Sequence, residues 1–129
     1  MEKENITVLV VDDDADYRQL MVFWLKSKGY TVLTAENGQQ ACQEVQNKKP
    51  DIVFMDLRMP VMDGIGAIKN IRRFNKNIPI IIISAYPEEP KIKEAVPFGI
   101  SGVFYKGKDF EEGLTVLESA LRTHKGLKK

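Results

Sequence analysis

One segment carries the strongest structural signal in this chain: Pro50-Asp51-Ile52-Val53-Phe54-Met55-Asp56. Four apolar residues, Ile52–Met55, stand between a helix-ending proline and an aspartate. The run is continuously apolar, whereas a half-exposed strand would alternate, and such runs are typical of strands buried on both faces of a parallel sheet. We therefore expect a central strand that brings Asp56 to its carboxyl end.

Working outward from this segment, the chain contains five short apolar runs in all: Ile6–Val11, Tyr30–Ala35, Ile52–Met55, Ile80–Ile83 and Val103–Tyr105. Amphipathic segments of helical period lie between them. Strands that alternate with helices in this way predict the α/β class, with a doubly wound, open, five-stranded parallel sheet and helices on both faces.

Apolar stripes at helical spacing define three of the intervening helices, within Tyr17–Leu25, Ile65–Ile71 and Phe110–Leu121. Gly29 stands where the first helix should end, because glycine readily adopts the left-handed conformation found there. Three prolines crowd Glu88–Phe98, so a helix in this segment should be limited to about two turns.

The length of 129 residues fits one domain. Asp109, with Glu112 three residues later, has the pattern of a helix N-cap and opens the last amphipathic segment. We expect a single domain over residues 1–129 with a core from about 6 to 121, and a frayed tail over 122–129.

Composition excludes several classes of function. Lys and Arg number 19 and Asp and Glu number 18, so the net charge of +1 predicts no binding to nucleic acid through this domain. Cys42 is the only cysteine, which excludes an internal disulfide and a cysteine-based zinc site. The aliphatic stretch Ile78–Ile83 is too short to cross a bilayer, so we expect no membrane contact and a cytoplasmic location.

Polar residues follow four of the five predicted strands, at Asp12-Asp13-Asp14, Asp56, Ser84 and Lys106. The carboxyl ends of parallel strands meet at one edge of a sheet, where ligands bind in folds of this kind. Clustered carboxylates repel one another, and a hard cation such as Mg²⁺ relieves that repulsion. An aspartate in such a site can attack phosphorus, while a hydroxyl and an ammonium neutralise the phosphoryl charge.

Each of these residues also has a simpler interpretation. Aspartates after strands often cap the next helix, as Asp14 could, and a lone serine or lysine after a strand is usually a surface residue. The chemical interpretation is favoured because four strands place compatible groups at the same edge.

Three blocks of sequence then resemble the receiver domains of response regulators: Val10-Val11-Asp12-Asp13-Asp14, the stretch Pro50 to Asp63-Gly64 that contains Met59-Pro60, and Ser84-Ala85 followed by Lys106. The similarity runs from about Ile6 to Leu121. It implies the flavodoxin-like (βα)₅ fold of chemotaxis regulators and a signalling phosphoacceptor domain that catalyses only its own phosphorylation and dephosphorylation.

The resemblance also implies a role for each matching residue. Asp56 corresponds to the phosphoacceptor, with Ser84 and Lys106 as its catalytic partners. Mg²⁺ would be held by Asp12, Asp13, Asp56 and the backbone carbonyl of Arg58. Arg58 and Tyr86 stand two residues after the acceptor and the hydroxyl, where bulky side chains would screen the phosphoryl group and slow its loss.

Two positions depart from the family pattern. Gly107 stands where a proline usually follows the lysine, so this loop should be more mobile. Val103 occupies the position of an aromatic residue that moves inward on activation, and its few rotamers should make that switch absent.

The partners implied are a sensor histidine kinase or a His-phosphotransfer protein, and a downstream target or an output domain outside this sequence, with the domain as a monomer or a weak phosphorylation-dependent dimer. Two alternatives on the same fold are a flavin or nucleotide binder, disfavoured by the aspartates after the first strand, and a Mg²⁺-dependent small-molecule phosphatase.

Overall fold

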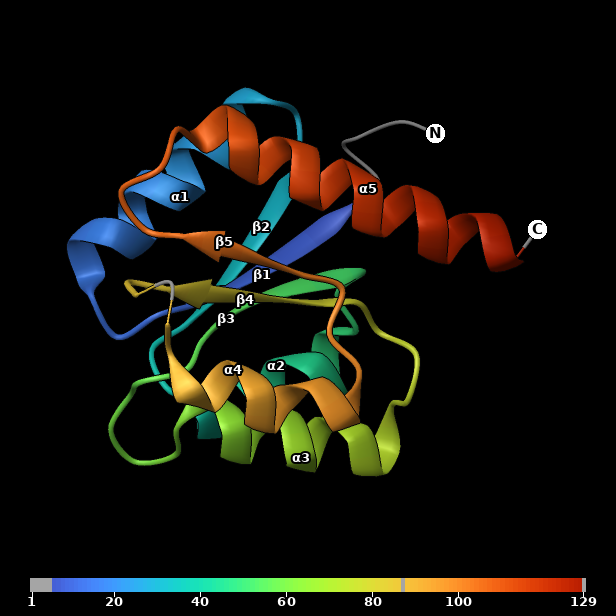
Figure 1. Ribbon diagram of the computed structural model, residues 1–129. Helices are drawn as coiled ribbons and strands as arrows, with labels where there is room; N and C mark the ends of the chain where they lie inside the picture. Colours follow the sequence, from blue (N-terminus) through green and yellow to red (C-terminus); the bar gives the residue numbers. More distant parts are fainter. Residues whose placement is uncertain (1–5, 87, 129) are drawn as a thin grey trace.

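A computed structural model describes residues 6–86 and 88–128 and shows one parallel sheet between two layers of helices (Figure 1). The strands are β1 (Thr7–Val11), β2 (Thr31–Ala35), β3 (Ile52–Asp56), β4 (Ile80–Ser84) and β5 (Gly102–Tyr105). The helices are α1 (Ala15–Ser27), α2 (Gly38–Lys48), α3 (Gly64–Phe74), α4 (Pro90–Ala95), the 3₁₀ helix η2 (Val96–Phe98) and α5 (Phe110–Lys128). The predicted five-stranded parallel fold is confirmed.

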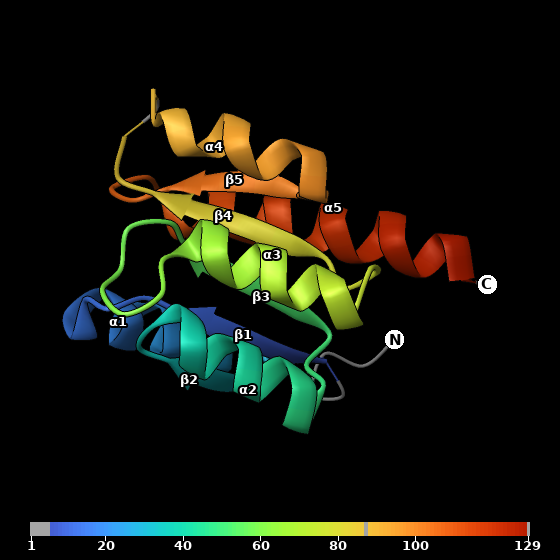
Figure 2. The ribbon, with the colours of Figure 1, turned by 90° about the horizontal axis from the view of Figure 1, so that it is seen from below.

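The strand order is β2-β1-β3-β4-β5. Helices α1 and α5 cover one face of the sheet, and α2, α3 and α4 cover the other (Figures 1 and 2). Each face carries its own apolar core, because successive strand residues point to opposite sides. In β1, Leu9 and Val11 pack toward α2 and α3, whereas Val8 and Val10 pack toward α1 and α5.

Strands β3 and β4 are buried along their whole length, as their continuous apolar sequences predict. They lie at the inside of the sheet, each paired on both sides. Their carboxyl ends carry Asp56 and Ser84, so the buried apolar residues anchor the two polar groups at one edge of the sheet.

Short polar residues start the first three helices. Asp14, Asn37 and Asp63 each accept a hydrogen bond from a backbone N–H in the first turn of α1, α2 and α3. The capping role considered for Asp14 is therefore present. Gly29, after α1, has a φ of 98°, which agrees with the helix end predicted there.

Two segments concern helix lengths that were expected from the sequence. The proline-rich segment forms the six-residue α4 followed by η2, in agreement with the short helix expected. For the tail expected over 122–129, the structure shows that α5 continues to Lys128, and the domain limits expected from the sequence stay a prediction.

Within residues 6–86 and 88–128, no helix is long and apolar enough to cross a bilayer. The cytoplasmic location expected from the sequence stays a prediction.

Val61, in the loop before α3, is strained. It has a φ of 69° and exposes 78% of its surface, and the left-handed conformation is costly for a β-branched residue. Val61→Asn should raise the free energy of unfolding by about 1 kcal/mol, because Asn tolerates this conformation. Urea denaturation measures the change.

Val96→Asn is the matched control, because Val96 is also exposed but has an ordinary helical φ of −53°. The strain argument would fail if Val61→Asn were no more stabilising than Val96→Asn.

Candidate functional site

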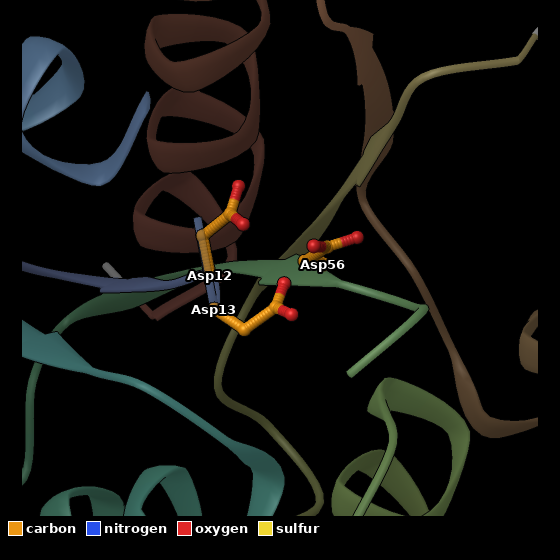
Figure 3. A group of neighbouring side chains, drawn as sticks. All are labelled: Asp12, Asp13 and Asp56. Carbon is orange, nitrogen blue, oxygen red and sulfur yellow. The ribbon is translucent and has the colours of Figure 1, made fainter. Parts of the chain in front are cut away.

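Three aspartates meet at the carboxyl edge of the sheet. Asp12 and Asp13 follow β1, and Asp56 ends the neighbouring strand β3, where Val11 pairs with Met55. One oxygen from each carboxylate lies within 4.8 Å of the others (Figure 3). Strand order reverses at β1, which makes this edge the crevice where α/β sheets bind ligands.

The three carboxylates differ in exposure. Asp12 is fully buried and Asp56 exposes 7% of its surface, whereas Asp13 is exposed. Asp12 Oδ1 accepts a hydrogen bond of 3.0 Å from the backbone N–H of Asp14. The site therefore combines a shielded inner pair of acids with one acid that faces solvent, where an incoming ligand can reach it.

Lys106 supplies the positive charge. Its Nζ lies 2.8 Å from Asp12 Oδ2 and 3.6 Å from Asp56 Oδ2. A backbone hydrogen bond of 2.8 Å from Lys106 N–H to the Ser84 carbonyl fixes its place beside β4. Burial opposes the charged form, but the hydrogen bond to Asp12 and the charges of Asp56 and Asp12 outweigh it and raise the pKa of Lys106.

Tyr17 contacts Lys106 from the other side. The ammonium lies 4.9 Å from the centre of the Tyr17 ring, within range of a cation–π interaction. Burial, together with the charges of Asp12 and Asp56, raises the pKa of Tyr17 to about 12. From the sequence, Tyr17 was predicted only as part of an apolar helix stripe. Its contact with Lys106, 89 positions later, cannot be predicted from a local sequence pattern.

The surroundings of Asp56 shift its pKa. Burial of its carboxyl, followed by repulsion from Asp12, raises its pKa to about 7, and Lys106 opposes this only in part. Three carboxylates face one ammonium, and all their donor atoms are oxygens. This donor set suits Mg²⁺, which prefers oxygen ligands and would relieve the repulsion. The residues present therefore fit the ion that the sequence analysis expected.

Ser84 ends β4 and is buried, with 4% of its surface exposed. Its hydroxyl donates to the Tyr86 carbonyl at 2.8 Å and accepts from the Tyr86 N–H at 3.1 Å. The hydroxyl is thus held by the loop after β4. It lines a cavity of about 250 Å³, together with Asp13, Asp56, Arg58, Tyr86 and Lys106.

Arg58 follows β3, two residues after Asp56, and its backbone N–H donates to Asp56 Oδ1 at 3.3 Å. Its side chain turns toward α4 and forms a two-point ion pair with Glu89. Glu89 was not among the residues selected from the sequence. It precedes a proline in a short helix, and nothing local shows that it faces a residue 31 positions earlier.

Gly64 brings the start of α3 against the end of β3. Its N–H donates to the Leu57 carbonyl at 3.0 Å, and a side chain there would place its Cβ 2.3 Å from the Asp56 carbonyl oxygen. Only glycine permits this approach, which packs the end of β3 tightly behind the site.

Comparison with known proteins agrees with this geometry. The family described as response regulator receiver domain matches residues 8–118. The transcriptional regulatory protein ZraR of Klebsiella oxytoca is 38% identical over 94% of this chain, which spans only 27% of that protein. Sporulation initiation phosphotransferase F of Bacillus subtilis is 36% identical over 84% of this chain and 87% of its own length.

Solved structures give the same answer. The chemotaxis protein CheY4 of Vibrio cholerae has a TM-score of 0.84 and 31% identity, covering 90% of this chain and 98% of its own. The CheY chain of a CheX–CheY–BeF3–Mg complex from Borrelia burgdorferi has a TM-score of 0.82 and 32% identity, covering 88% of this chain and 87% of its own. The resemblance inferred from sequence is confirmed.

The raised pKa of Asp56 predicts a pH-dependent stability. Between the ordinary pKa of 3.8 and about 7, the metal-free folded protein keeps a proton that the unfolded chain has lost. The contribution of Asp56 to the free energy of unfolding therefore falls as pH rises through this window. Asp56→Asn cannot titrate at this position and therefore avoids this loss. The free energy of unfolding of the variant should exceed that of wild type by an amount that grows from pH 4 to pH 8 and reaches about 1–2 kcal/mol.

Urea denaturation in EDTA measures this difference. Asp16→Asn, at an exposed position in α1, is the control and should gain nothing as pH rises. An Asp56→Asn advantage that is the same at pH 4 and pH 8 would contradict the assignment.

The contact between Tyr17 and Lys106 makes a second prediction. Tyr17→Leu should lower the pKa of Lys106, because it removes the aromatic face that stabilises the ammonium. Tyr17→Phe should leave this pKa unchanged, since the buried Tyr17 hydroxyl has no hydrogen-bond partner among the described residues. NMR titration of the Lys106 side chain tests both variants, and an equal effect of Leu and Phe would refute the cation–π contact.

Proposed function

The chain belongs to the response regulator receiver domain family, and on this premise we propose that it accepts a phosphoryl group on Asp56 from a phosphohistidine. Domains of this family are signalling phosphoacceptors. One observation supports the assignment most strongly: β1, β3 and β5 bring Asp12, Asp13, Asp56 and Lys106 together, with the ammonium 2.8 and 3.6 Å from two of the acids.

Transfer begins with attack of an Asp56 carboxylate oxygen on phosphorus. A phosphorus–oxygen bond forms, the phosphorus–nitrogen bond of the donor breaks, and the electron pair leaves on the imidazole nitrogen. Lys106 already lies beside Asp56 and neutralises charge on the phosphoryl oxygens. Tyr17 holds the ammonium in place through its ring.

Mg²⁺, held by Asp12, Asp13, Asp56 and the backbone carbonyl of Arg58, would supply further neutralisation of the transferring group. Asp13 is the exposed carboxylate of this set and would receive the ion from solvent.

We propose that Ser84 acts after transfer. Its hydroxyl, now bonded to the Tyr86 backbone, would turn toward the phosphoryl group and give up those two bonds. Arg58 and Tyr86 line the same cavity, where their bulk would hinder the water that hydrolyses the acyl phosphate. We propose slow self-dephosphorylation on this basis.

The proposed donor is a sensor histidine kinase or a His-phosphotransfer protein. The reader of the signal would be a downstream protein or an output domain, since relatives such as ZraR are much longer than this chain. We propose that residues 1–129 act as one receiver domain in this exchange, and that the domain works in the cytoplasm.

Acetyl phosphate with Mg²⁺ tests the function. We expect wild-type protein to gain the mass of one phosphoryl group at Asp56, and Asp56→Asn to gain none, because an amide cannot form the acyl phosphate. Intact-protein mass spectrometry and mapping of the labelled peptide provide the measurement.

Asp16→Asn serves as the control, because it removes an exposed aspartate outside the site and should label like wild type. Labelling of the Asp56→Asn protein at the wild-type level would refute the proposed function. EDTA should abolish labelling of wild type if the acidic cluster requires the metal.

A further inference from the structure

Two ion pairs tie the loop after the acceptor strand to the start of α4. Arg58 binds Glu89 through two hydrogen bonds, and Lys91 Nζ lies 3.0 Å from Asp63 Oδ2. Arg58 and Asp63 both belong to the loop between β3 and α3, while Glu89 and Lys91 lie at the first turn of α4. The position of α4 beside the site is therefore set by charge as well as by apolar packing.

The Arg58–Glu89 pair is asymmetric. The Glu89 side chain exposes 2% of its surface and the Arg58 side chain 60%. Glu89 also caps α4 by accepting from the Lys91 N–H at 3.1 Å. A shielded charge of this kind needs its partner, and Arg58 is the partner that makes two contacts.

The same arginine lies next to the phosphoacceptor. Its backbone N–H contacts Asp56 Oδ1, and both Arg58 and Glu89 line the cavity that contains Asp56. A phosphoryl group on Asp56 would occupy this cavity and would itself carry about two negative charges in place of the single charge of the carboxylate. A guanidinium binds phosphate oxygens with the same two-point geometry that it uses for a carboxylate.

We propose that Glu89 is a positioning residue that holds the Arg58 side chain away from Asp56, and that a phosphoryl group on Asp56 competes with Glu89 for this guanidinium. The inference rests on the proposed function and deepens it. Phosphorylation would exchange one ion pair for another and release one of the two ties on α4. This route to α4 requires no aromatic residue at the position of Val103.

The Arg58–Glu89 ion pair differs from an ordinary surface salt bridge. Exposed pairs stabilise proteins little, because water and salt compete with them. Here the two hydrogen bonds and the shielded carboxylate fix the guanidinium in one place. An anion that displaces Glu89 must therefore form contacts of similar strength, and few groups other than a phosphoryl group can do so.

Glu89→Gln tests the competition, because Gln keeps the size and the capping oxygen but removes the charge. Arg58 should then be free to neutralise the incoming group, and labelling of Asp56 by acetyl phosphate with Mg²⁺ should become about fivefold faster. Glu88→Gln removes the same charge one residue earlier, at an exposed position, and should label at the wild-type rate.

The double variant Glu89→Gln with Arg58→Ala separates positioning from a general effect on the fold. In the Arg58→Ala background, Glu89→Gln should change the labelling rate no further, because the residue on which it acts is gone. A rate for Glu89→Gln at or below that of wild type and Glu88→Gln would overturn the proposal. So would an acceleration that persists without Arg58.

A second measurement uses the wild-type chain alone. The NMR signal of the Arg58 Nε–H should move when beryllofluoride and Mg²⁺ occupy the site, and should move toward its position in Glu89→Gln. An Arg58 signal that stays unchanged while the Asp56 region responds would overturn the competition and leave phosphorylation of Asp56 intact. Wild-type protein that takes no label at Asp56 would instead refute the proposed function itself.

Discussion

Repulsion among three carboxylates at one edge of the sheet is the constraint around which this domain is built. Asp12 and Asp56 are both shielded from water, and burial together with the nearby Asp12 disfavours the charged form of Asp56. The buried strands β1 and β3 hold them together because their apolar side chains fill both cores. Hydrophobic burial of the strands thus holds together carboxylates that would move apart in water. The resulting site can take a cation or a phosphoryl group.

Lys106 neutralises part of this negative charge, and its neighbours hold the ammonium in a fixed position. The ammonium lies between Asp12 and the ring of Tyr17. Tyr17 in turn packs near Phe110 at the start of α5, which stacks on Trp24. The loop after Lys106 contains Gly107 with a φ of 89°, so the aromatic contacts, rather than a rigid loop residue, restrain the lysine.

The opposite side of the site is organised by the loop after β3. Gly64 lets α3 approach β3 closely, whereas Val61, in the loop between them, has an unfavourable backbone conformation. Arg58 and Asp63 connect this loop to α4 through ion pairs. Positive charge therefore lies on both sides of Asp56, from Lys106 after β5 and from Arg58 after β3, and each cation has an acid that holds it before any ligand arrives.

The sequence by itself determined the five strands, their parallel arrangement in one α/β fold, and the edge that collects Asp12, Asp56 and Lys106. These features follow from continuous apolar runs and from the polar residues that end them, both of which can be recognised in short stretches of sequence. Only the tertiary structure decided that Tyr17 covers Lys106 and that Glu89 holds Arg58. Those contacts join residues far apart in the chain, and packing of helices against the sheet, which no local period encodes, sets their distances.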